Sequence, residues 1–252
     1  MKNKLKSFAP IFTLIILIGC WYVVAMSVNA TILVPTPHKV FISFGEILGE
    51  ISFYKSIISS VGRTFLSFLI GFILGVMVAI VAGISSFFEK LFYPIIILVR
   101  ATPTMSIIFL CIIWFNSQIS PMVVCLTVIF PLFYSSTLQA IKSVDKNLIE
   151  MSNFYKITKR QQILWLYLPA VASRLFADSI SILAFNVKLM ISAEALSRTQ
   201  LSLGREMAIS KESLETARLI CYALTAVALS YVFEIFLKAI KKLIDRWRYV
   251  EA

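Results

Sequence analysis

The sequence predicts an all-α integral membrane protein with six transmembrane helices and both termini in the cytoplasm. Of its 252 residues, 59% are hydrophobic and only 15% are charged, and the mean hydropathy is +0.88. A soluble domain carries about 25% charged residues, so this chain has too little polar surface to cover a globule in water. The net charge of +11 would suggest nucleic acid in a soluble protein. In a membrane protein it is typical of Lys and Arg held on the cytoplasmic side.

The first predicted helix is an apolar run from residue 8 to about residue 26, preceded by three lysines. A cleaved signal peptide is the alternative, because Val28-Asn29-Ala30 resembles a small-residue cleavage site. Five further apolar runs follow, so the chain stays in the membrane in either case. We therefore expect this segment to be an uncleaved first span.

An amphipathic helix at the outer membrane surface is expected next. Thr36 is a good N-cap and Pro37 suits the first helical position. Apolar residues then recur at three- and four-residue spacing over a stretch too short and polar to span. They are Val40, Phe41, Phe44, Ile47 and Leu48.

The second span, about residues 57–84, repeats small side chains every four residues. This spacing predicts a groove in which a neighbouring helix approaches closely. Arg63 lies near the outer end of this span, and we expect its side chain to snorkel to the surface. The groove residues are Ser67, Gly71, Gly75, Ala79 and Gly83.

Four more apolar runs complete the predicted membrane domain. The third span covers about residues 93–115, the fourth 122–141 with Pro131 inside it, the fifth 171–196 and the sixth 214–239. We divide the chain into residues 1–56 (first span and surface helix), a core membrane domain of residues 57–240 that includes a cytoplasmic loop at 142–170, and a basic cytoplasmic tail of residues 241–252.

The distribution of basic residues gives the orientation. With the N-terminus inside, the predicted cytoplasmic segments hold fourteen Lys and Arg and the outer segments hold five. This positive-inside bias places the 145–170 loop and both termini in the cytoplasm.

Several chemistries have no basis in the sequence. There is no phosphate-binding G-x-x-x-x-G-K-[ST] loop, no metal-ligand cluster and no candidate catalytic triad, so the chain does not bind ATP through such a loop itself. The four cysteines fall in apolar runs and His38 has no partner cluster. We therefore predict a transport pathway rather than an enzyme, with no cofactor and no catalytic residue.

The cytoplasmic loop is predicted to form two short helices that meet at a sharp turn. Asp145 is placed to cap a first helix running to about Tyr155. Thr158 and Gln161 have capping-box spacing for a second helix that ends near Pro169. The tip of Tyr155, Lys156 and Ile157 could act as a lever that a partner moves together with spans four and five. The alternative is an interfacial helix held on anionic lipid by Lys156, Lys159 and Arg160.

Polar residues inside the spans are candidates for the translocation path. A buried lysine is costly in a membrane, so Lys188 is expected to face the bundle interior or an aqueous cavity. As a hypothesis, Lys188 lines the path and favours an anionic solute; the alternative is a structural ion pair with Asp178, Glu234 or a second subunit. Glu194 lies six residues on and does not share its face. Arg100 and Thr102 are weaker candidates, beside a helix break expected at Pro103.

A resemblance to a known family adds to these patterns. Glu150-Met151-Ser152, Lys156 and Leu166-Tyr167-Leu168-Pro169 resemble, at matching intervals, the E-A-A-x3-G-x9-I-x-L-P loop of ABC-importer permease subunits. Further segments are similar to motifs of the nitrate/sulfonate/taurine-type permeases, over about residues 33–240. They are Leu33-Val34-Pro35-Thr36-Pro37, Arg100-Ala101-Thr102-Pro103, Ser192-Ala193-Glu194 and Ser202-Leu203-Gly204.

The resemblance implies a type I ABC importer permease that forms half of a homodimeric pore. Its implied partners are two ATPase subunits, an extracytoplasmic solute-binding protein, a second copy of itself and the lipid bilayer, with no nucleic acid. The implied solute is a sulfonate, taurine, nitrate or a thiamine-precursor pyrimidine. The loop would couple ATP hydrolysis by the partner to transport. The residues it assigns to this coupling are Glu150, Met151, Ser152, Tyr155, Lys156, Ile157, Leu166, Leu168 and Pro169.

The loop departs from the family pattern at three positions. Met151 and Ser152 replace two alanines, and Lys156 replaces a glycine. Lysine in a left-handed turn costs about 1 kcal/mol, so either the turn or the matching ATPase differs. A secondary transporter or channel is the alternative function, but the two halves of the sequence show no self-similarity of the kind expected for inverted repeats.

Overall fold

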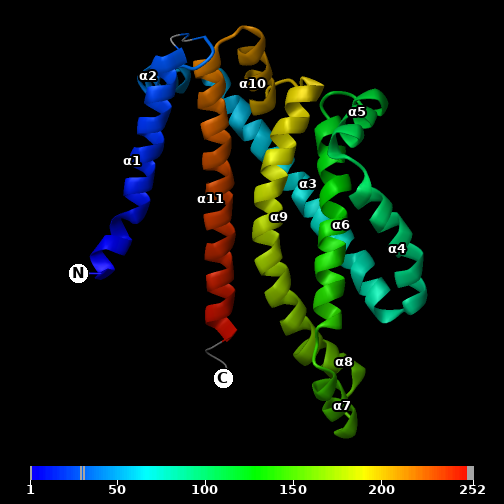
Figure 1. Ribbon diagram of the computed structural model, residues 1–252. Coiled ribbons are helices and arrows are strands. Elements are labelled where there is room, and N and C mark those ends of the chain that lie inside the picture. Colours follow the sequence, from blue (N-terminus) through cyan, green and yellow to red (C-terminus); the bar gives the residue numbers. More distant parts are fainter. Residues whose placement is uncertain (1, 29, 31, 249–252) are drawn as a thin grey trace.

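The computed structural model describes residues 2–28, 30 and 32–248, and every regular element in this part of the chain is helical. Figure 1 shows long helices side by side, with short helices at both ends of the bundle. The elements are α1 (Lys2–Val28), α2 (Pro37–Leu48), α3 (Ile51–Ile84), α4 (Ser86–Ala101), α5 (Thr104–Trp114), α6 (Ser120–Lys142), α7 (Lys146–Phe154), α8 (Lys159–Gln162), the π-helix Ile163–Tyr167, α9 (Leu168–Ser197), α10 (Leu203–Glu212) and α11 (Thr216–Arg248).

The membrane-spanning character predicted from composition is present in the described residues. Four helical stretches are long and apolar enough to cross a membrane: Ile51–Ile84, Ser120–Lys142, Lys159–Ser197 and Thr216–Lys242. The pair α4 and α5 makes a fifth span if it is counted as one. The count of six spans and the cytoplasmic position of the termini remain predictions.

The predicted third span is not one straight helix. α4 ends at Ala101, α5 begins at Thr104, and the two helices are bent by 96° at this break. Pro103 stands just before α5, where it has no N–H to continue the ladder of α4. The helix break expected there is confirmed, and the predicted third span consists of two helices.

The small residues of α3 lie against α6. A methyl group added to Gly71 would come within 2.7 Å of the Ile129 side chain, and one added to Gly75 within 2.6 Å of Cβ of Phe133. Only glycine allows so close an approach of the two helices. Ser67 and Ala79 are buried on the same face, while Gly83 is more exposed but faces Ile141.

The end of the bundle that carries α2 and α10 is the predicted outer end. Thr36 caps α2, and its hydroxyl accepts from the Lys39 N–H, as expected. Val40 and Ile47 of α2 are buried in a core that also includes Tyr222 of α11. Phe44 packs against the same core, whereas Phe41, Ile42 and Leu48 are exposed, so α2 is held by one face.

The opposite end carries α7 and α8, which project beyond the other helices (Figure 1). The prediction that the second loop helix stops near Pro169 is wrong. α8 continues through the π-helix into α9, so helical structure runs from Lys159 to Ser197. Pro169 falls at the first positions of α9, which tolerate a missing N–H.

Candidate functional site

The segment from Asp145 to Pro169, which we call the elbow, joins α6 to α9 and includes the first two residues of α9. The Asp145 carboxylate accepts from the Asn147 N–H at 2.8 Å and caps α7. Thr158 and Gln161 form a reciprocal capping box at the start of α8. Both predicted caps are therefore confirmed, and the two helices begin where the sequence placed them.

The turn between α7 and α8 is closed by local hydrogen bonds. The Ile157 N–H donates to the Ser152 carbonyl and the Lys156 N–H to that of Asn153, each at 3.0 Å. Lys156 has φ 53°, the left-handed conformation that usually requires glycine. The side chain of Asn153 also accepts from Gln162 at 2.7 Å and ties the two helices together. The turn is thus closed by backbone and side-chain hydrogen bonds within the elbow.

The elbow presents apolar side chains to its surroundings. Phe154 is 81% exposed and Tyr155 70%, and their rings pack edge to face at its tip. Met151 and Trp165 are also exposed, as are Glu150 and Leu168, whereas Ser152 is buried. Leu166, Pro169 and Ile157 are half-buried. Exposed apolar residues concentrated on a charged loop mark an interaction surface.

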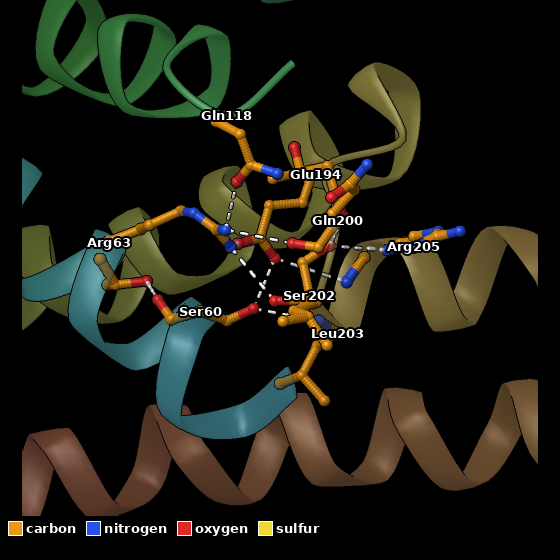
Figure 2. Close-up of polar contacts among 12 residues, drawn as sticks. Ser60, Arg63, Gln118, Glu194, Gln200, Ser202, Leu203 and Arg205 are labelled. Atoms are coloured by element: carbon orange, nitrogen blue, oxygen red, sulfur yellow. Dashed lines mark hydrogen bonds and ion pairs between the residues drawn. The ribbon is translucent and has the colours of Figure 1, made fainter. Parts of the chain in front are cut away.

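A second cluster lies near the predicted outer end and is built around a buried carboxylate. We call it the outer clamp: Ser60 and Arg63 of α3, Gln118, Glu194 of α9, and residues 200–204 before and at the start of α10. Figure 2 shows these groups converging from four parts of the chain. The Glu194 side chain is fully buried, and its Oε1 lies 3.1 Å from Nη1 of Arg63. Its Oε2 accepts from the Ser60 hydroxyl at 2.6 Å and from the Gly204 N–H at 3.4 Å.

Arg63 also donates hydrogen bonds to two connecting segments, at Gln118 and at residues 200–201. Its Nη2 donates to Oε1 of Gln118 at 2.7 Å and to the Gln200 carbonyl at 3.1 Å, and its Nη1 donates to the Leu201 carbonyl at 3.4 Å. The expectation that Arg63 snorkels is therefore wrong, because its side chain turns inward. A buried ion pair is tolerable only when further hydrogen bonds satisfy both groups, and this one meets that condition.

The Ser202-Leu203-Gly204 motif lies at the start of α10. The Ser202 hydroxyl caps α10 by accepting from the Arg205 N–H at 3.1 Å. A methyl group on Gly204 would lie 2.3 Å from the Ile191 carbonyl oxygen and 2.5 Å from the Ala195 nitrogen. The glycine therefore lets α10 rest on the backbone of α9. Glu194 of α9 adds to that contact by accepting a hydrogen bond from the Gly204 N–H.

The structure separates the four residues proposed for the translocation path. Glu194 is sealed in the clamp and lines no open space. Lys188 is exposed on a different face of α9, and among the described residues no carboxylate lies within ion-pair distance of it. Arg100 lines an open cavity between α4 and α6. The Thr102 hydroxyl donates to the Leu98 carbonyl and closes the end of α4.

The acidic partners suggested for Lys188 within the chain are engaged elsewhere. Asp178 lies 3.8 Å from Arg174 and accepts a hydrogen bond from Ser136. Glu234 pairs with Lys238 at 2.5 Å. The face of α9 that carries Lys188 also exposes Ser181, Phe185 and Ser192, so it forms a mixed polar stripe along a membrane-spanning helix.

Comparison with known proteins adds a family match. Residues 71–248 match the family described as "Binding-protein-dependent transport system inner membrane component". The chain is 30% identical to a putative aliphatic sulfonates transport permease protein, SsuC, of Bacillus subtilis over 158 residues, which cover 62% of this chain and 57% of that protein. It is 24% identical to the Escherichia coli protein of the same description over 98% of this chain and 94% of that one.

A third relative and two solved structures extend the comparison. The formylaminopyrimidine transport permease protein ThiX of Halalkalibacterium halodurans is 20% identical over 68% of each chain. An inward-facing MetNI methionine ABC transporter chain aligns with a TM-score of 0.65 at 16% identity, covering 76% of this chain and 95% of that one. A bacterial ABC transporter for alginate import gives 0.66 at 12% identity, covering 96% and 98%. These two structures share the fold.

Proposed function

Because the chain belongs to the family of binding-protein-dependent transport system inner membrane components, we propose that its elbow docks on an ATPase subunit and drives a solute path lined by α9. The chain is the membrane-spanning permease subunit of an ABC importer. ATP hydrolysis is assigned to the partner, and the permease converts the partner's motion into a change of access across the membrane.

The elbow is the observation that carries this proposal. Its tip exposes Phe154 and Tyr155, while the backbone around Lys156 is closed by hydrogen bonds within the turn. A rigid protrusion of this kind transmits force instead of absorbing it. It is continuous with α9 and follows α6 directly, so a partner that displaces the tip would move both spans as rigid bodies.

The solute path is proposed along the exposed stripe of α9. Lys188 brings a positive charge into a span without an acidic partner among the described residues, which favours contact with water or with an anion. The relatives named for aliphatic sulfonates suggest an anionic solute of that class, and the relative named for formylaminopyrimidine suggests a pyrimidine instead. The free lysine favours the anion.

The assembly we propose contains two copies of this chain, two ATPase subunits and an extracytoplasmic solute-binding protein. A second copy facing the stripe of α9 would enclose Lys188 in a central path rather than leave it against lipid. The solute-binding protein would dock at the end that carries α2 and α10.

Co-purification tests the docking role of the elbow. We expect the wild-type chain to retain an ATPase subunit through purification, and Tyr155→Asp to lose most of it because a charge replaces an apolar contact. Glu150→Gln should weaken the complex less. Glu212→Gln, which alters an exposed carboxylate at the other end of the bundle, is the control and should retain the ATPase. Equal retention by wild type and Tyr155→Asp would contradict the proposal.

Uptake tests the path. Lys188→Met keeps an unbranched side chain, one atom shorter, and removes its charge. We expect ATP-dependent uptake of an alkanesulfonate by reconstituted vesicles to fall at least tenfold while the ATPase is still retained. Unchanged uptake by this variant would show that Lys188 does not line the path.

A further inference from the structure

The cavity between α4 and α6 contains a cation that the protein leaves unpaired. Arg100 lies in the last turn of α4, and its guanidinium makes one described hydrogen bond, from Nη1 to the Ser135 hydroxyl at 3.3 Å. No carboxylate in the described part of the chain lies within ion-pair distance of it. A guanidinium carries five N–H donors. Most of them are therefore available to a ligand, because Arg100 is exposed.

The cavity has the size of a small-molecule site. Its volume is about 440 Å³, within the range typical of ligand pockets. This space accommodates a short-chain organic ion, and because the cavity is open it also accommodates the headgroup of a lipid.

Hydrogen-bond donors collect on the α6 side of the cavity. Tyr134 lines it with a side chain only 4% exposed, and its hydroxyl has no protein partner. Gln139 also lines it and uses its amide oxygen to accept from Arg174 at 3.1 Å, so its NH₂ group is left to donate. Arg100 and the Gln139 amide supply donors and a positive charge, as recognition of an oxyanion requires, and the hydroxyl of Tyr134, another lining residue, is buried without a protein partner.

The remaining lining suits an apolar tail and does not repel an anion. Ile96, Ile97 and Leu138 contribute hydrocarbon to the walls. The one carboxylate of the lining, that of Glu89, is neutralised by Lys142 at 2.5 Å. This ion pair joins the first turn of α4 to the last residue of α6, at the predicted cytoplasmic end of the cavity.

We infer that this cavity is an inner binding site for a small organic anion with a short apolar tail, with Arg100 as its charge-recognising residue. The inference rests on the proposed function, because it makes the ligand the solute on its way to the cytoplasm. It adds a site on α4 and α6, separate from the stripe of α9. A phosphate or sulfate headgroup of a lipid presents the same chemistry, so the experiment must separate the two sources.

Direct binding to the purified full-length chain in nanodiscs of zwitterionic lipid tests the site. The probe is pentanesulfonate, and the matched neutral probe is pentanesulfonamide. We expect wild type to bind the sulfonate and to bind the sulfonamide at least tenfold more weakly. Arg100→Gln should weaken sulfonate binding at least tenfold, Arg100→Lys about threefold, and Tyr134→Phe two- to fivefold. Arg198→Gln makes the same change of charge at the outer end and should leave binding unchanged.

Three results would overturn the inference: no sulfonate binding by wild type, equal binding of the two probes, or unchanged binding by Arg100→Gln in a correctly folded variant. Repeating the measurement in nanodiscs with phosphatidylglycerol separates the lipid. If that lipid abolishes sulfonate binding, the cavity is a lipid site and the inference also fails. Retention of an ATPase during purification reports on the proposed function independently, since Arg100→Gln leaves the elbow intact.

Discussion

The elbow and the outer clamp lie at opposite ends of the same helical stretch, and they differ in where their interactions are completed. In the clamp, Glu194 is fully buried and Arg63 is half-buried, and both are satisfied by groups from four parts of one chain. In the elbow, the hydrogen bonds join residues at most nine positions apart, and apolar side chains such as Phe154 remain exposed. The polar groups of the clamp are satisfied within the chain, whereas apolar side chains of the elbow remain exposed, as its proposed docking role requires.

The largest expected effect is on stability at the clamp. Glu194→Ala leaves Arg63 buried without its counter-charge, which typically costs about 3–5 kcal/mol. We expect a marked drop in the thermal unfolding temperature in detergent. Phe154→Ser in the elbow is the matched variant and should unfold at the wild-type temperature, because its side chain is already exposed. Equal destabilisation by both variants would break the distinction between the two regions.

A smaller loss is expected where α10 rests on α9. Gly204→Ala places a methyl group 2.3 Å from the Ile191 carbonyl, and overpacking of this kind costs about 1–3 kcal/mol. Thermal unfolding measures this, with Gly45→Ala as the control because nothing lies within 4 Å of an added methyl group there. If Gly204→Ala unfolds like Gly45→Ala, the close approach of α9 and α10 does not contribute as argued.

A gain is expected in the elbow. Lys156 has φ 53°, and glycine at this position removes about 1 kcal/mol of backbone strain. Lys156→Gly should lower the rate of amide hydrogen exchange in the α7–α8 turn. Exchange at the clamp should not change, since the two regions share no contact. Faster exchange in the turn would show that the lysine side chain, and not its backbone, holds the elbow.

The smallest effect is a pH dependence beside the clamp. Burial raises the pKa of the Glu206 carboxyl in α10 above its ordinary value, and this outweighs the opposing charges of Arg205 and Arg218. Folding therefore favours the protonated form of Glu206. The stability that this gives the folded protein is fully present below the unfolded pKa of about 4.3, and it is lost as pH rises through the raised folded pKa.

Glu206→Gln should remove that decline, which unfolding temperatures measured from pH 4 to pH 8 would detect. Glu212→Gln, an exposed residue of the same helix, should retain the wild-type profile. A profile unaltered by Glu206→Gln would assign the pH dependence to another group.

Features set by nearby residues were predicted best from the sequence. The caps at Asp145 and Thr158, the surface helix at Thr36 and the break at Pro103 depend on residues within four positions of one another, and all four are present. The membrane fold followed from composition. The 96° angle between α4 and α5 did not, because proline stops a helix without fixing its new direction.

The clamp could not be assembled from the sequence because its members are far apart along the chain. Ser60 and Glu194 are separated by 134 positions and Arg63 and Gln118 by 55. The available signals were an arginine inside the second span and a glutamate near the end of the fifth. Each was assigned on its own, Arg63 to the surface and Glu194 to the path. Two opposite charges that each lie near the outer end of a span could have been paired with one another.

The π-helix between α8 and α9 sets the direction in which the elbow points around the axis of α9. Its hydrogen bonds join residues five apart, so Ile163–Tyr167 accommodates one residue more than an α-helical turn would. Deleting one residue there would restore an uninterrupted α-helical ladder, but it would turn everything on the cytoplasmic side by about 100° about the axis of α9. Phe154 and Tyr155 would then point in a different direction around the axis of α9, while the local contacts within α7 and α8 were kept. The direction of the elbow is therefore set by different residues from those that set its conformation.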